Sequence, residues 1–243
     1  MPNEHVGASE PQNCMIFTIK EWNLREAERL KEAYPQDRFF VFSEPEKLDV
    51  QVIEKINPRY IFFPHWSWII PNSIFERWEC VIFHLGDVPD GRGGSPLQNH
   101  ILRKKYITTI SALRATSRID EGSVYCKRQF SLYGGAEEIF LRLSKTIFRE
   151  IIPHILMNNP QPQEQQGDGS CFPRRKAEQS DFTKNTLTSL DDIFDLIRML
   201  DAEGYPKSYL NFGEFRLTFG RAQRKYGKVI ADVEITMPGG EME

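Results

Sequence analysis

The sequence has 243 residues, of which 40% are hydrophobic and 27% are charged, a composition typical of soluble globular proteins. The formal net charge of −3 argues against a general nucleic-acid-binding protein. No apolar run is long enough to span a bilayer, and the polar N-terminal stretch does not resemble a signal peptide. The four cysteines lie far apart without a CxxC pair, so we predict a cytoplasmic protein with no metal site.

Short apolar runs alternate with helical periodicities along most of the chain. Runs rich in β-branched and aromatic residues predict strands at 15–19, 38–42, 60–63, 80–83, 106–113 and 124–130. Apolar residues spaced three and four apart predict helices at 24–33, 49–56, 71–78, 97–104 and 136–156. The alternation predicts an α/β fold with a Rossmann-like, mainly parallel sheet covered by helices on both faces.

The composition changes after the last of these helices. The segment 158–171 is rich in Gln, Pro and Gly and is typical of a linker. Beyond it, a helix is predicted at 190–203 and an antiparallel pair of strands at 215–219 and 229–235. The predicted organisation is a poorly ordered terminus at 1–14, a main domain at 15–157, a linker at 158–171 and a small C-terminal α+β subdomain at 172–243.

A histidine stands where the strand at 80–83 ends. His84 is followed by a loop whose segment 89–96 holds three glycines, two prolines and one arginine. The carboxyl ends of strands in α/β sheets are common ligand sites, and an imidazole can move a proton near neutral pH. Glycines would let the loop backbone approach a ligand closely. The alternative interpretation is a structural histidine followed by an ordinary turn.

Three motifs in this order resemble those of formyltransferases that use N10-formyltetrahydrofolate. They are His84, the Arg-Gly-Gly-Ser-Pro segment at 92–96, and Asp120 followed by Gly122. The segments 172–175 and 197–206 are similar to the start of the C-terminal part of the family members that modify nucleotide-linked sugars. The main resemblance covers residues 60–155 and implies an N-formyltransferase with the family's fold.

The resemblance implies transfer of a formyl group from N10-formyltetrahydrofolate to a nucleotide-linked (dTDP, UDP or GDP) amino-dideoxy sugar, as in the biosynthesis of O-antigen and lipopolysaccharide. The short C-terminal part and the acidic balance disfavour a tRNA substrate. We therefore predict folate and the nucleotide sugar as partners, with no nucleic acid and no membrane, and a homodimer formed by the C-terminal unit. Two alternatives stay open: a catalytically impaired folate- or nucleotide-binding module, and a formyltransferase acting on another small amine.

Formyl transfer requires a base for the attacking amine and a donor for the oxyanion. The resemblance assigns the base to His84, with Asp120 as the carboxylate that orients it; Asp120 could instead be a turn residue. The family's oxyanion-binding asparagine would fall on Ile82, which has no side-chain donor, so Asn99 is a possible replacement. The predicted folate-binding residues are Pro64, His65, Trp66, Trp68, Gly94, Thr116, Ser117, Arg118 and Ile119, and the predicted substrate-binding residues are Arg92, Gly93, Arg174 and Arg175.

Overall fold

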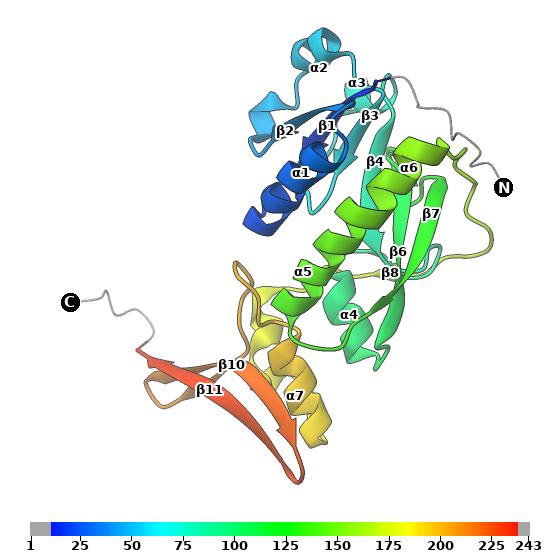
Figure 1. Cartoon of the computed structure of the whole chain (residues 1–243). Coiled ribbons are helices and arrows are strands. Elements are labelled where there is room, and N and C mark those ends of the chain that lie inside the picture. Colours follow the sequence, from blue (N-terminus) through cyan, green and yellow to red (C-terminus); the bar gives the residue numbers. More distant parts are fainter. Residues whose placement is uncertain (1–10, 238–243) are drawn as a thin grey trace, which may run out of the picture. The chain divides into compact units, whose positions relative to one another are not determined.

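The computed structural model describes residues 11–237, which form two compact units (Figure 1). Unit 1 comprises the chain up to His84 together with Ile110–Arg128 and Leu143–Gly167, and unit 2 comprises the remaining segments. The predicted terminus at 1–14 lies outside the described residues up to residue 10, and its last two residues belong to the first strand. Because the two units interleave along the chain, the predicted domain boundaries stay a prediction.

The main sheet has six strands in the order β2-β1-β3-β4-β6-β7. Their bounds are β1 Asn13–Phe17, β2 Arg38–Phe42, β3 Tyr60–Phe63, β4 Cys80–Leu85, β6 Ile107–Arg114 and β7 Val124–Ser131. β1 pairs in parallel with both β2 and β3, and β3 pairs in parallel with β4. This arrangement confirms the predicted Rossmann-like, mainly parallel sheet.

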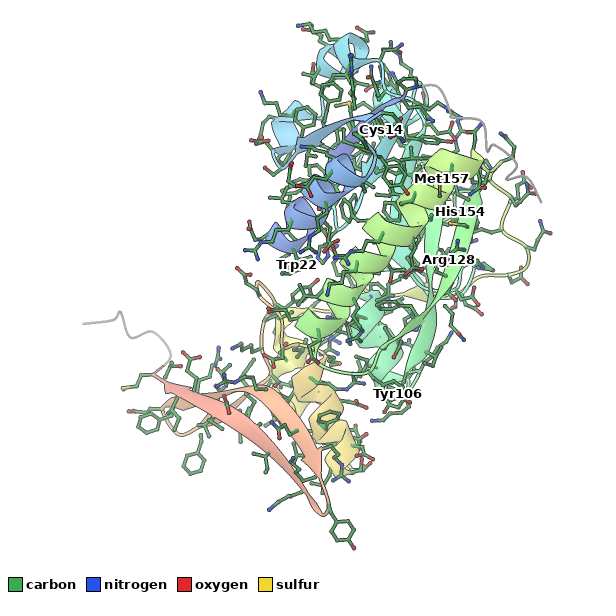
Figure 2. All side chains as sticks on the ribbon, viewed as in Figure 1. Cys14, Trp22, Tyr106, Arg128, His154 and Met157 are labelled. Atoms are coloured by element: carbon green, nitrogen blue, oxygen red, sulfur yellow. The ribbon has the colours of Figure 1, made fainter. Side chains whose placement is uncertain are left out.

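Helices follow the strands, as the alternation of the sequence predicted. The helices that lie wholly in unit 1 are α1 Glu21–Ala33, α2 Val50–Ile56, α3 Asn72–Phe75 and α6 Ile152–Asn158. The helix α5, Ala136–Thr146, begins with residues of unit 2 and continues into a π-helical turn at Ile147–Ile151 before α6. The predicted single helix at 136–156 therefore contains a change of hydrogen-bond pattern that apolar spacing does not reveal. His154 and Met157 lie on α6, and Trp22 lies on α1 (Figure 2).

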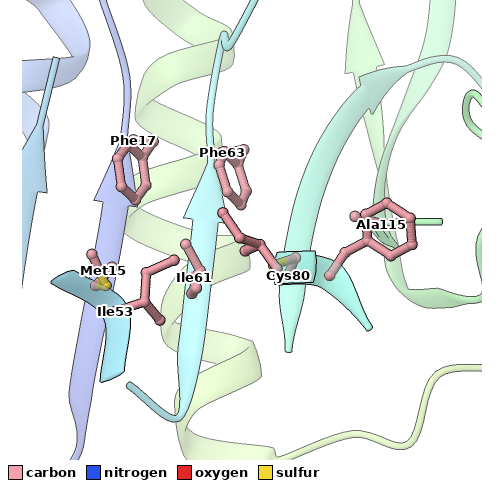
Figure 3. Packing of buried hydrophobic residues seen from close by; sticks show 9 residues of the cluster. Met15, Phe17, Ile53, Ile61, Phe63, Cys80 and Ala115 are labelled. Carbon is pink, nitrogen blue, oxygen red and sulfur yellow. The ribbon is translucent and has the colours of Figure 1, made fainter. Parts of the chain in front are cut away.

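The core of unit 1 supports the ends of its strands. Met15, Phe17, Ile61 and Phe63 are almost fully buried and pack with Ile53 of α2 (Figure 3). The rings of Phe17 and Phe63 stack with their centroids 5.5 Å apart. Each such side chain contributes roughly 1.5–3 kcal/mol of burial free energy, so the loops that leave these strands start from a rigid platform.

The chain that follows α6 is held to β3 by hydrogen bonds. Asn159 adopts a left-handed conformation with φ 41° and accepts a hydrogen bond from the Tyr60 hydroxyl at 2.6 Å. Tyr60→Phe is expected to lower the free energy of unfolding by about 1 kcal/mol, since one partly buried hydrogen bond is lost. Urea denaturation measures this change, and Tyr226→Phe, at a fully exposed position, serves as the control. Equal stability of the two variants would contradict the prediction.

Unit 2 contains a small sheet, the second part of the predicted fold class. Its antiparallel strands are β9 Tyr209–Phe212, β10 Phe215–Lys225 and β11 Lys228–Thr236, in the order β11-β10-β9. The helix α7 (Leu190–Arg198) packs on β10 and begins at Ser189, whose hydroxyl accepts a hydrogen bond from the Asp192 amide. α7 is shorter than the predicted helix at 190–203, and α4 (Pro96–Leu102) also belongs to this unit.

Among residues 11–237, no helix combines the length and the apolar character that crossing a bilayer requires.

Candidate active site

His84 and Asp120 meet within unit 1. His84 lies near the end of β4, and its Nδ1 is 3.2 Å from Oδ2 of Asp120. The two side chains are only 5% and 12% exposed, so solvent screens this contact little. A carboxylate on Nδ1 fixes the ring orientation and leaves Nε2 as the nitrogen that would accept a proton from an amine. The structure therefore brings the predicted base and the predicted orienting carboxylate together.

The loop between β6 and β7 places Asp120. Asp120 itself adopts a left-handed backbone conformation with φ 56°, which short polar residues tolerate best. Gly122 passes so close to the preceding strand that a Cβ atom there would lie 1.7 Å from the Arg114 carbonyl oxygen. The Arg114 amide donates to the Ser123 carbonyl at 2.9 Å, which closes the base of the loop. Only glycine fits at position 122, and the loop geometry depends on it.

The other predicted folate residues of this loop make local contacts. The Thr116 hydroxyl donates to the Arg118 carbonyl at 2.9 Å, and the Arg118 guanidinium pairs with Glu121 at 3.3 Å. Ser117 is exposed, and so is Ile119. The structure thus places these side chains on the same loop as Asp120, and their contact with folate stays a prediction.

The aromatic loop after β3 divides into a packed part and an exposed part. Pro64 accepts a hydrogen bond from the Thr18 hydroxyl at 2.7 Å, and the Trp66 ring packs edge-on against Phe17. Trp68, in contrast, is 46% exposed. Trp66 therefore contributes to the core, and Trp68 is the tryptophan of this loop that solvent or a ligand can reach.

His65 gives unit 1 a dependence on pH. Burial, with a smaller effect of the Lys20 ammonium, lowers the pKa of His65 from 6.5 to about 4. Between these two pH values the unfolded chain binds a proton that the folded chain excludes, so stability falls as the pH falls through this window. His65→Asn is expected to reduce this loss of stability, because the asparagine side chain does not bind a proton in this window. Asparagine also tolerates the φ of 54° at this position. Denaturant titrations across the window measure the difference.

His154→Asn, at a partly exposed position of α6, is the matched control and should retain the wild-type dependence. An equal loss of stability in the His65→Asn variant and the wild-type protein would contradict the assignment to His65.

The glycines of the segment 89–96 are explained by packing within unit 2. The strand β5 (Arg92–Gly93) pairs in parallel with β8 (Cys171–Phe172). A Cβ at Gly93 would lie 2.6 Å from the Phe172 carbonyl oxygen, and one at Gly94 would lie 2.6 Å from Cα of Arg174. The missing side chains at Gly93 and Gly94 leave space for the backbone of residues 172–174 of the same unit. The prediction had explained these glycines by the approach of the loop to a ligand.

Asn99 also holds this part of unit 2. Its Nδ2 donates to the carbonyls of Gly94, Ser95 and Pro173 at 3.0, 3.1 and 3.0 Å, and its Oδ1 accepts from Arg103. Because its donors are engaged by backbone carbonyls, the geometry gives no support to the predicted oxyanion role.

Another predicted substrate residue, Arg175, donates from its Nη2 to the Gln179 carbonyl at 2.6 Å. Burial lowers the pKa of this guanidinium. Arg92 and Arg174 also belong to unit 2, and their roles toward a substrate stay predictions. Among residues 11–237, no group of three or more His, Cys, Asp and Glu side chains is arranged to hold a metal ion.

Sequence reasoning missed Gln165, which reaches the Asp120 loop from the predicted linker. Its Nε2 donates to the carbonyls of Asp120 and Gly122, both at 2.8 Å. A single glutamine in a segment without periodicity carries no signal of such a contact.

Comparisons with known proteins agree with this geometry. A methionyl-tRNA formyltransferase from Clostridium thermocellum superposes with a TM-score of 0.90 and 47% identity, covering 93% of this chain and 99% of that one. The chain belongs to the formyltransferase family. Residues 177–236 of this family member match the model described as "Methionyl-tRNA formyltransferase, C-terminal domain".

Two more distant relatives match the chain at lower identity. A methionyl-tRNA formyltransferase from Rickettsia massiliae is 27% identical over 129 residues, and the matched region spans 51% of this chain but only 42% of that protein. A sugar N-formyltransferase from Shewanella sp. FDAARGOS_354 superposes with a TM-score of 0.63 at 15% identity, covering 91% of this chain and 96% of that one. The second likeness shows the fold alone.

These findings overturn the predicted substrate. The nucleotide-linked amino sugar, and with it a role in O-antigen or lipopolysaccharide biosynthesis, is wrong, because the relative matched over nearly its whole length at 47% identity is a methionyl-tRNA formyltransferase. The prediction against a nucleic-acid partner is wrong for the same reason. It relied on the short C-terminal part and on the net charge of −3. The net charge averages over a basic stretch, since residues 205–228 contain six Lys or Arg and one Glu.

Proposed function

We propose that this protein transfers a formyl group from N10-formyltetrahydrofolate to the amine of methionyl-tRNA. The observation that carries the proposal is the 47% identity with the methionyl-tRNA formyltransferase of Clostridium thermocellum over 99% of its chain. The 3.2 Å contact between His84 and Asp120 supports the proposal, because it provides an imidazole base oriented by a carboxylate. We infer that folate is the co-substrate and that the reaction is acyl transfer between two nitrogens.

The proposed reaction uses the imidazole as a general base. The neutral amine attacks the formyl carbon, and Nε2 of His84 takes the proton that the amine loses as the new C–N bond forms. The Asp120 carboxylate stabilises the resulting imidazolium through Nδ1. Collapse of the tetrahedral intermediate then breaks the bond to the folate nitrogen, and the imidazolium returns the proton to that leaving nitrogen.

The proposed nucleic-acid partner is supported by the C-terminal part of unit 2. The basic stretch at 205–228 covers β9, all of β10 and the turn that leads to β11. Lysine and arginine side chains bind the phosphates of nucleic acids and release counterions, so such binding weakens with salt. The predicted homodimer stays a prediction beside this proposal.

A transfer assay with purified protein and N10-formyltetrahydrofolate tests the function. Methionyl-tRNA, uncharged tRNA and methionine methyl ester are compared as acceptors. We expect formylmethionyl-tRNA as the product and no modification of uncharged tRNA, because the attacking group is the α-amine. No product with any acceptor would overturn the reaction, and an equal kcat/KM for the methyl ester would overturn tRNA as the partner.

A further inference from the structure

We propose that Gln165 is a positioning residue that holds Asp120 in the orientation needed to bind the His84 ring. This inference rests on the proposed function for its catalytic consequence. Its structural part concerns only residues of unit 1, and those contacts are independent of any substrate.

The segment that carries Gln165 is fixed to the start of β7. Gln163 and Val124 form an antiparallel bridge in which each backbone amide donates to the other residue's carbonyl, at 2.7 and 2.9 Å. Gln165 is two residues further along and is half-buried, whereas both of its neighbours are exposed. The bridge thus delivers one side chain of this stretch to the Asp120 loop.

The Gln165 amide uses both of its N–H groups on that loop. Nε2 donates to the Asp120 carbonyl and to the Gly122 carbonyl, at 2.8 Å each. Two donors from one rigid planar group fix the orientation of both carbonyls and therefore of the backbone between them. A substitute for Gln165 would need a side chain of the same length with two N–H donors on its terminal group.

The Asp120 backbone needs such support. Its left-handed conformation, with φ 56°, is unfavourable for a non-glycine residue and persists when surrounding contacts hold it. The Cα–Cβ direction at position 120 follows from this conformation, and it sets where Oδ2 meets Nδ1 of His84. Loss of the Gln165 contacts would let the loop relax and would move the carboxylate away from the ring.

The test compares Gln165→Met, which keeps the chain length and removes both donors, with Gln166→Met. Gln166 is the matched control because it is exposed and its amide donates to the Glu164 carbonyl in its own segment at 3.4 Å. In the transfer assay, Gln165→Met should lower kcat by about 10- to 100-fold with an unchanged KM for the folate, as misplaced catalytic groups do. In an Asp120→Asn background the same substitution should have no further effect on kcat.

A spectroscopic measurement separates this inference from the proposed function. The His84 Nδ1–H proton is sheltered by Asp120, so it should give a downfield ¹H NMR signal in the free protein, assigned by its absence from His84→Asn. We expect the signal in the wild-type and Gln166→Met proteins and its loss in Gln165→Met. If the protein transfers no formyl group, this experiment still decides whether Gln165 holds the pair.

Gln165→Glu, with the same number of heavy atoms, replaces Gln165→Met if that variant does not fold. It presents oxygen atoms to two carbonyl oxygens and should lose the signal as well. A retained Nδ1–H signal in the substituted protein would overturn the inference. An equal decrease in kcat with and without the Asp120 carboxylate would overturn it too, because the glutamine would then act independently of Asp120.

Discussion

Replacing His84 with asparagine is expected to lower kcat for formyl transfer by about 10²–10⁴-fold, the usual contribution of a positioned general base. The asparagine side chain can still donate to Asp120 through its amide, so the carboxylate keeps a partner and the buried site need not rearrange. It cannot accept the proton of the attacking amine. Rates with saturating N10-formyltetrahydrofolate measure the effect on the chemical step.

His154→Asn is the matched control for this prediction. It makes the same change of residue type at a partly exposed position on α6, where the ring contacts Asn158 of the same helix, and it should retain wild-type kcat. Tetrahydrofolate binding, measured by calorimetry, should be similar in both variants and in the wild-type protein. A His84→Asn variant with wild-type kcat would remove the base from the proposed mechanism.

Gly122→Ala is expected to lower the free energy of unfolding by about 2–3 kcal/mol, the upper part of the range for overpacked positions. The added methyl group would lie 1.7 Å from the carbonyl oxygen of Arg114 and 2.9 Å from its carbonyl carbon. Both atoms are backbone, so no side chain can move aside. Either β6 or the Asp120 loop must shift, and a shift of the loop carries the carboxylate away from His84.

Gly135→Ala provides the comparison for Gly122→Ala. The nearest atom to a Cβ at position 135 is the Glu138 carboxylate oxygen at 3.9 Å, an ordinary contact distance. Its stability should change by less than about 0.5 kcal/mol. Denaturant unfolding ranks the two variants, and the transfer assay shows whether the Gly122 variant also loses activity. Equal stability of the two variants would show that the loop accommodates the methyl group without cost.

The inner strands of the main sheet were predicted well because they are nearly continuous in apolar residues. β3 occupies the predicted residues, Tyr60–Phe63, and all four of its side chains are buried. A strand that is buried on both faces is a continuous run of apolar residues, so it can be recognised from its own sequence without knowing the neighbouring strand. Short helices were predicted less well: α3 spans only Asn72–Phe75 of the predicted 71–78. The end of α3 depends on contacts with residues distant in the sequence, and the spacing of nearby apolar residues does not reveal these contacts.

Sequence reasoning found the site residues whose side chains can take part in proton transfer, and it missed the residue that only positions the backbone of others. His84 and Asp120 stand out by their motifs, and the structure pairs them. Ile82, the position of the missing family asparagine, packs against the core cluster of unit 1. Gln165 acts on backbone carbonyls, which every residue has, so no pattern of residue types marks its target.

The contacts made by residues 163–165, which follow α6, limit how this chain can be divided for experiments. A fragment that stops at residue 157, the end of the predicted main domain, would lack both the Gln163 bridge and the Gln165 amide. It would keep His84 and Asp120 yet lose the contacts that hold the Asp120 loop. A fragment carried through Gly167 retains these contacts but still divides unit 2, whose segments 85–109 and 129–142 would lose the residues from 168 onward. The His84–Asp120 pair is therefore best studied in the full chain.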